Sequence, residues 1–244
     1  MKQFEDAQAL VAHAREAFKG LQVAYGASLR EKAVKPALLI QIKNLLENLR
    51  SALDYAAAGL HEKYGEPGCG HPKIYFPYAL ESQSAAAFRK SGRIEKCIPR
   101  LSASRPDIVR KLEAYQAFAD PANAWLPRFM FLCNKNKHQR LDPQVRQEAK
   151  ELRISSGGAV GMRVSEGSSV KLGRGASIRF GGGLVTTGEQ TFDVDNPPVP
   201  IGPGSVESVT WVDFRFASNS EPVLTLLTAA IDGVAGIVAE LESL

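Results

Sequence analysis

Residues 36–64 read PALLIQIKNLLENLRSALDYAAAGLHEKY, and this stretch decides the fold. Its apolar residues recur every three or four positions, which is the spacing of one face of an α-helix. They are Leu38, Ile42, Leu45, Leu49, Leu53, Ala56 and Leu60. Pro36 suits a first helical turn, whereas Gly65 and Pro67 end the pattern. The spacing therefore predicts one long helix, from Pro36 to about Tyr64, at the centre of a helical bundle.

Shorter helices are predicted on both sides of this stretch. Apolar residues recur at helical spacing before Gly26, which is expected to end the first helix. The sequence Ser104-Arg105-Pro106-Asp107 combines a capping serine, an early proline and an acid, which together predict a helix start. The expected helices cover residues 3–24, 82–90, 104–118, 121–138 and, as a last helical stretch, 146–150.

After Pro143 the apolar residues alternate with a period of two, which is typical of strands. Residues 159–164, 170–172 and 178–180 show this alternation and are separated by glycines. The proline-rich residues 196–203 predict a surface loop, and residues 206–216 predict the strongest strand. A final helix is expected after Pro222, and its apolar stripe must be covered by the bundle, the sheet or a second subunit.

These patterns predict an α+β fold in three parts. Residues 1–150 form an N-terminal helical bundle, and residues 151–219 form an antiparallel β-rich region. Residues 220–244 form a C-terminal amphipathic helix that packs on one of the two. No apolar run approaches the ~18–20 residues that cross a bilayer, and the start lacks the apolar segment of a secretory signal. The three cysteines are odd in number and far apart, so we expect reduced thiols in a cytoplasmic protein without membrane contact.

The positive charge is concentrated in the first part of the chain. Residues 1–150 contain 24 Lys and Arg against 15 Asp and Glu, whereas residues 151–244 contain 6 against 11. Within residues 89–111 eight cations face only Glu95 and Asp107. A field of one sign attracts polyanions such as RNA. The same charges also fit a solvated helical surface, or a basic face that docks on the acidic second part.

The first candidate site lies on the long helix. Arg50 and Asp54 are four residues apart, and His61 follows Arg50 by eleven, so all three fall on one helical face. Such a pair is often a surface ion pair. Because Leu49 and Leu53 are core positions, a partly buried pair is equally consistent with the pattern.

The second candidate site is the helix end Asn134-Lys135-Asn136-Lys137-His138-Gln139-Arg140. Cations at a helix C-terminus are favoured by the helix dipole, which gives a structural interpretation. The functional interpretation is an anion site, in which Lys137 or Arg140 holds a phosphate and His138 exchanges protons near pH 7. Metal-independent RNA cleavage needs an acid and a base, so a homodimer that pairs two histidines would complete the set.

Metal and cofactor chemistry finds little support in the sequence. His61, Cys69 and His71 match no standard metal spacing and lack a fourth ligand. Glycine-rich segments are not followed by the residues of a phosphate loop, and nucleophile-elbow and metalloprotease motifs are absent. We therefore expect no metal and no cofactor.

Four stretches in fixed order resemble a large family of uncharacterised bacterial proteins. They are NLRSALD at residues 48–54, YFP at 75–77, NKNKHQR at 134–140 and WVDFRF at 211–216. The helical part is similar to HEPN domains, helical bundles many of which are dimeric ribonucleases. HEPN nucleases carry a histidine four to six residues after an arginine. Here Arg50 precedes His61 by eleven residues and Arg128 precedes His138 by ten.

Two functions follow, and the sequence leaves open whether the protein is an enzyme. In the first, a HEPN-like protein binds RNA or another phosphate-bearing ligand between the two sites. Cleavage would then use His138 and Arg50, while the ligand is held by Asp54, Asn134, Lys137, Arg140 and His61. In the second, the protein is a non-catalytic interaction or small-ligand module, and the same polar residues form a structural network.

Overall fold

The computed structural model describes residues 1–31, 35–65, 74–138, 141–156, 159–180, 183–199 and 204–244. Contacts within the chain divide it into two compact units. Unit 1 combines Met1–Val145 with Arg215–Leu244, and unit 2 is Arg146–Phe214. The chain leaves unit 1 within strand β1 (Gln144–Ser156) and returns to it within strand β7 (Gly204–Phe216).

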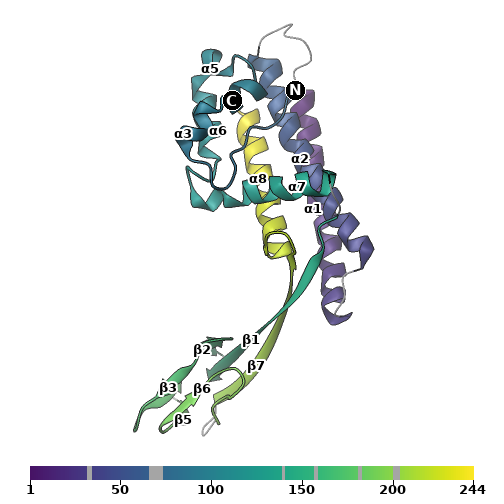
Figure 1. Cartoon of the computed structure of the whole chain (residues 1–244). Coiled ribbons are helices and arrows are strands. Elements are labelled where there is room, and N and C mark those ends of the chain that lie inside the picture. Colours follow the sequence, from purple (N-terminus) through teal and green to yellow (C-terminus); the bar gives the residue numbers. More distant parts are fainter. Residues whose placement is uncertain (32–34, 66–73, 139–140, 157–158, 181–182, 200–203) are drawn as a thin grey trace. The chain divides into compact units, whose positions relative to one another are not determined.

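Unit 1 is a bundle of helices (Figure 1). Helix α1 (Lys2–Glu31) lies alongside α2 (Pro36–Tyr64), and α7 (Trp125–His138) crosses α2. Helix α8 (Val223–Glu242) contacts all three. The remaining helical segments of the unit are short: α3 (Ala85–Lys90), α4 (Arg93–Cys97), α5 (Leu101–Ser104), α6 (Pro106–Ala114) and the 3-10 turn η1 (Pro121–Ala124).

The long helix predicted from Pro36 to Tyr64 is confirmed, and every residue of its expected stripe is buried. Further residues outside that stripe are also buried: Leu46, Ala52, Ala57 and Gly59. The burial is wider because α1, α7 and α8 all pack against α2. Each fully buried leucine contributes about 1.5–3 kcal/mol, so the buried face of α2 contributes substantially to the stability of unit 1.

The predicted C-terminal helix is confirmed as α8. Its apolar stripe is covered within unit 1 by α1, α2 and α7, which answers the question that the sequence left open. Among the described residues, α8 is also the one helix long and apolar enough to cross a membrane, with a mean hydropathy of 1.7. The expectation that no apolar run reaches this length is therefore wrong. Length and composition are weak support for a membrane span, since core helices of soluble proteins meet the same criterion.

Several boundaries of the helical part differ from the expectation. Helix α3 begins at Ala85 rather than at 82, and the helix expected from 121 opens with the 3-10 turn η1 before α7 starts at Trp125. Helix α1 continues through Gly20 and Gly26 to Glu31, because its packing on α2 offsets the cost of glycine, about 1 kcal/mol per residue. Helix α6 begins at Pro106 without a side-chain cap, and its end at Ala114 comes earlier than predicted. The Ser104 hydroxyl instead donates a hydrogen bond to the carbonyl of Tyr64, 3.0 Å away.

Residues 146–150, expected to be helical, belong to strand β1. In unit 2 this strand pairs antiparallel with β2 (Ala159–Ser165), and the three-stranded sheet has the order β2-β1-β7. Two further antiparallel pairs are β3 (Val170–Leu172) with β6 (Gln190–Phe192) and β4 (Ser177–Phe180) with β5 (Gly183–Thr187). The antiparallel β-rich region is thus confirmed. One apolar cluster joins these strands: Leu152, Ile154, Val164, Ile178, Val185, Phe192 and Val194.

The predicted loop at residues 196–203 is described only up to Val199, and residues 196–199 form no strand. Pro198 is buried, so this part of the loop does not lie wholly on the surface. The predicted strand at 206–216 is contained in β7 and is confirmed.

A close approach of α7 and α8 at Gly233 leads to the first prediction. A β-carbon at this position would overlap the ring of Trp125. We expect Gly233→Ala to lower the free energy of unfolding by about 1–3 kcal/mol through overpacking. Gly236→Ala is the matched control, since no atom lies within 4 Å of its added β-carbon. The control should stabilise α8 by about 0.5–1 kcal/mol. Urea unfolding of both variants measures the difference, and equal effects would contradict the close packing.

Candidate functional site

Three of the predicted site residues meet where α7 crosses α2. The Arg50 Nη1 donates a hydrogen bond to the Asn134 Oδ1 at 2.6 Å. The Arg50 Nε lies 3.9 Å from the Asp54 Oδ2, as an i,i+4 ion pair. The side chains of Arg50 and Asp54 are 17% and 24% exposed, so the pair is partly buried rather than a solvated surface pair. This group of residues, the Arg50 centre, links α2 to α7.

The Arg50 centre also holds an irregular segment of the chain, residues 74–80. The Asp54 Oδ1 accepts a hydrogen bond from the backbone N–H of Phe76 at 2.8 Å. The Asn134 Nδ2 donates to the hydroxyl oxygen of Tyr78 at 3.0 Å. Buried Gln116 adds a third attachment, because its Oε1 accepts from the N–H of Ala79 at 2.8 Å. Hydrogen bonds from side chains, rather than pairing with a neighbouring strand, therefore hold this segment in place.

Burial is the main influence on the pKa of the Asp54 carboxyl group. Desolvation raises the pKa of its carboxyl group above the ordinary value of 3.8, and this is the largest influence. The N–H of Phe76 and the charges of Arg50 and Lys137 act in the opposite direction. The carboxylate is thus held by specific partners in a place where its charge is poorly solvated.

Cations and aromatic rings surround the Arg50 centre. Lys137 is exposed on α7, three residues after Asn134, and its charge acts on Asp54. The Arg93 guanidinium of α4 lies 5.6 Å from the centroid of the Tyr78 ring. Tyr75, which directly precedes Phe76, is 45% exposed. These groups give the centre cationic and aromatic neighbours, together with the carboxylate of Glu47, whose charge also acts on Asp54.

Three other predicted residues lie apart from the centre or outside the described side chains. His61 is in the last turn of α2, eleven residues after Arg50, which is about 16 Å along the helix axis. His138 ends α7, but its side chain and the whole of Arg140 lie outside the described residues. Cys69 and His71, weighed as metal ligands, lie outside them as well. Within the described residues, no three His, Cys, Asp or Glu side chains gather as a metal site would require.

The cysteine that packs at the helix crossing is not a reactive group. Cys133 is buried on α7, and its thiol contacts the carbonyl of Leu46 at 3.6 Å. Burial raises the pKa of the Cys133 thiol far above its usual range, which keeps it protonated. Burial likewise raises the pKa of Cys97. Neither thiol has the lowered pKa of a catalytic nucleophile.

Several residues of the centre were not predicted as site residues. Phe76, Tyr78 and Arg93 join it from the irregular segment and from α4, a helix that the apolar spacing did not indicate. The stretch YFP at residues 75–77 was noted as part of the resemblance, but helical spacing says nothing about such a segment. A backbone N–H that binds a carboxylate leaves no signal in the sequence.

No protein-family model, no curated protein and no solved structure matches this chain. The resemblance to HEPN domains and the homodimer that it implies therefore stay predictions from the sequence motifs.

The bond between Asp54 and Phe76 gives the second prediction. Asp54→Ala leaves a backbone donor without its acceptor and should lower the free energy of unfolding by about 1–3 kcal/mol. Asp54→Asn keeps an acceptor oxygen at the same place. It loses a partly exposed ion pair, worth about 0–1 kcal/mol, but it also removes a charge that burial disfavours, so its effect should be smaller than that of Asp54→Ala. Thermal or urea unfolding at neutral pH measures both. A larger loss for Asn than for Ala would contradict this role of the carboxyl oxygen.

The pH dependence of the same group gives the third prediction. Because the pKa of Asp54 is raised on folding, the folded protein holds this proton more tightly than the unfolded chain. The contribution of Asp54 to stability should therefore fall as the pH rises from 3.8 through the folded-state pKa. Asp54→Asn should remove this part of the slope in a series of urea unfolding curves between pH 3.5 and about 7. An unchanged slope would show that other groups cause it.

Proposed function

We propose that the protein binds RNA through its phosphates beside the Arg50 centre and does not cleave it. The observation that carries this proposal is the Arg50 guanidinium, which Asn134 and Asp54 hold in one orientation while 17% of the side chain stays exposed. A guanidinium has five N–H donors in a planar fork that matches phosphate oxygens. The hydrogen bond to Asn134 uses Nη1 only, which leaves donors for a ligand.

The surroundings of the Arg50 centre favour a ligand that has both phosphates and bases. Lys137 is exposed next to the centre and adds a second cation for the backbone of the ligand. Tyr75, the residue before Phe76, supplies an exposed aromatic ring. Single-stranded RNA is commonly bound by this combination, since phosphates pair with cations and unpaired bases stack on aromatic side chains.

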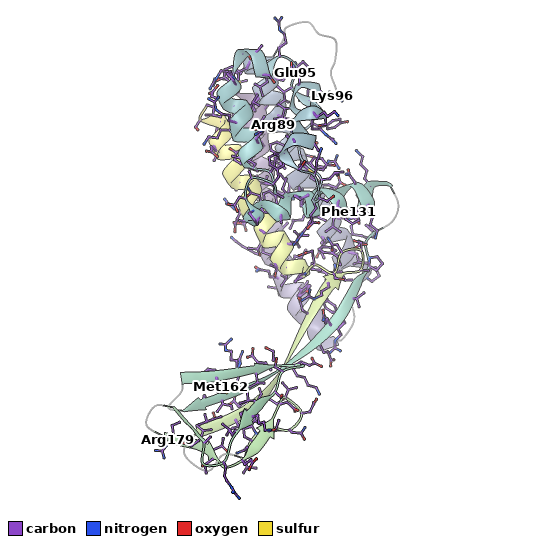
Figure 2. The ribbon with its side chains drawn as sticks, turned by 60° about the vertical axis from the view of Figure 1, so that its left-hand side comes forward. Arg89, Glu95, Lys96, Phe131, Met162 and Arg179 are labelled. Carbon is purple, nitrogen blue, oxygen red and sulfur yellow. The ribbon has the colours of Figure 1, made fainter. Side chains whose placement is uncertain are left out.

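The basic stretch at residues 89–111 contributes fewer available charges than its sequence suggests. Ion pairs join Arg89 to Glu113, Arg105 to Asp107 and Lys111 to Glu240. Lys90, Lys96 and Arg110 are exposed and have no carboxylate partner among the described residues. Figure 2 labels Lys96 and Arg89 on this part of unit 1. These remaining cations would attract a polyanion to the unit, while the Arg50 centre would fix its position.

The arrangement of titratable groups favours binding over cleavage. Cleavage of RNA without a metal needs a base and an acid near the same phosphate. One oxygen of Asp54 is occupied by the N–H of Phe76, and His61 lies about 16 Å along α2 from Arg50. Among the side chains that the structure describes, the centre therefore has no pair of groups for proton transfer.

A charge reversal tests the binding proposal and gives the fourth prediction. Lys137→Glu should weaken binding of a fluorescent single-stranded RNA and lower the salt slope of the affinity by about 1, because one phosphate contact is lost. Lys171→Glu is the matched control, since Lys171 is exposed on β3 in unit 2. Fluorescence anisotropy over a range of salt concentrations measures both. Equal weakening by the two variants would show that net charge alone is responsible and would overturn the proposed site.

Tyr75→Ala tests the stacking contact in the same assay. The ring is exposed, so its loss should leave folding intact and reduce affinity by about 1–3 kcal/mol for each stacked base. Incubation of the RNA with the unaltered protein in EDTA tests the non-catalytic part of the proposal. Intact RNA is the expected result, whereas cleavage that His138→Ala abolishes would establish a nuclease.

A further inference from the structure

A hollow of about 300 Å³ lies between α1 and α2. Its rim carries four polar side chains, none of which is permanently charged: His13 from α1, and Gln41, Asn44 and Asn48 from α2. No Lys, Arg, Asp or Glu lines the hollow. The four rim side chains make no hydrogen bond to any other residue that the structure describes. Primary amides carry both donors and acceptors, so the rim offers both kinds of hydrogen bond to a ligand.

The floor of the hollow is apolar. Leu21 and Leu45 are 2% and 1% exposed and close the bottom of it. Gly20 lies at the side of the hollow, and a β-carbon added there would meet no atom within 4 Å. The open space therefore results in part from the missing side chain of Gly20, and no neighbouring atom requires a glycine at this position.

The residues that form the hollow are poor choices for a helix. Glycine costs about 1 kcal/mol relative to alanine in a helix interior, and asparagine is also unfavourable there. Gly20, Asn44 and Asn48 nevertheless occupy interior positions of α1 and α2. The packing does not explain Gly20, since no atom lies within 4 Å of an added β-carbon.

We propose that this hollow binds a nucleobase. The flat face of the ring would lie over Ala17 and Gly20, the exposed apolar residues of the lining. Its polar edge would meet the amides of Asn44 and Gln41. Amide side chains pair with the donor and acceptor edge of a base in this manner. A phosphate or carboxylate does not fit, since the lining offers no compensating charge. A volume at the lower end of the range for ligand sites, about 300–1,000 Å³, suits one ring system.

This inference goes beyond the proposed function because a nucleoside without phosphate would suffice for binding. The test uses adenosine and cytidine as probes on the ¹⁵N-labelled full chain. The side-chain amide signals of Gln41, Asn44 and Asn48 should shift as a nucleoside is added. Gly20→Leu fills the hollow with a good helix former, so it should raise the melting temperature and at least halve these shifts. Gly236→Leu is the control, because that helical glycine is equally open and belongs to α8.

The outcomes separate this inference from the proposed function. Shifts that vanish in Gly20→Leu and persist in Gly236→Leu support a base site. Absent shifts with both nucleosides overturn it, as do shifts that Gly20→Leu leaves unchanged. Shifts caused only by a neutral peptide, acetyl-glycyl-asparaginyl-glycinamide, overturn it in favour of a peptide site. Lys137 does not line the hollow, so RNA binding that Lys137→Glu leaves unchanged counts against the proposed function and not against the hollow.

Discussion

The burial of α2 on three sides is the constraint on which unit 1 depends. Its leucines contact α1 along one side, α7 where the two helices cross, and α8 along another side. The hydrophobic effect is non-directional and does not by itself fix how closely two helices pack. Small residues set these distances. Gly59 contacts the ring of Phe4, and Gly233 contacts that of Trp125. Because glycine has no side chain, the aromatic ring can approach the helix backbone at these two positions.

The packing of α2 also decides where its polar groups lie. A helix covered on three sides leaves a narrow strip at which charged residues reach solvent. Arg50 and Asp54 lie at the edge of that strip, close enough to the core to be ordered by partners and exposed enough to meet a ligand. The cost of desolvating Asp54 is part of this arrangement, and the N–H of Phe76 and the Arg50 guanidinium offset only part of it, since the pKa of Asp54 stays raised. Order at the site thus comes from the core rather than from the ligand.

Periodic patterns of apolar residues predicted the elements whose side chains face one core. They failed where contacts with other elements determine the secondary structure. Helix α2, helix α8 and strand β7 each follow from a single repeating spacing. Gly26 predicts a helix end, but α1 packs on α2 and continues past it. Residues 146–150 have no pattern of their own and pair as part of β1. At the site, helical spacing correctly put Arg50 and Asp54 on one face, whereas Phe76 and Tyr78 bind through groups that spacing cannot indicate.

The discontinuous course of unit 1 has a consequence for biosynthesis. Helix α8 completes the core of the unit, yet it is made only after the whole of Arg146–Phe214. At ~5–20 residues per second, the ribosome needs roughly 4–15 s to proceed from residue 146 to the start of α8. During that interval the apolar faces of α1, α2 and α7 that α8 will cover are exposed on the nascent chain. The order of the segments therefore delays completion of the core of unit 1 until α8 has been made.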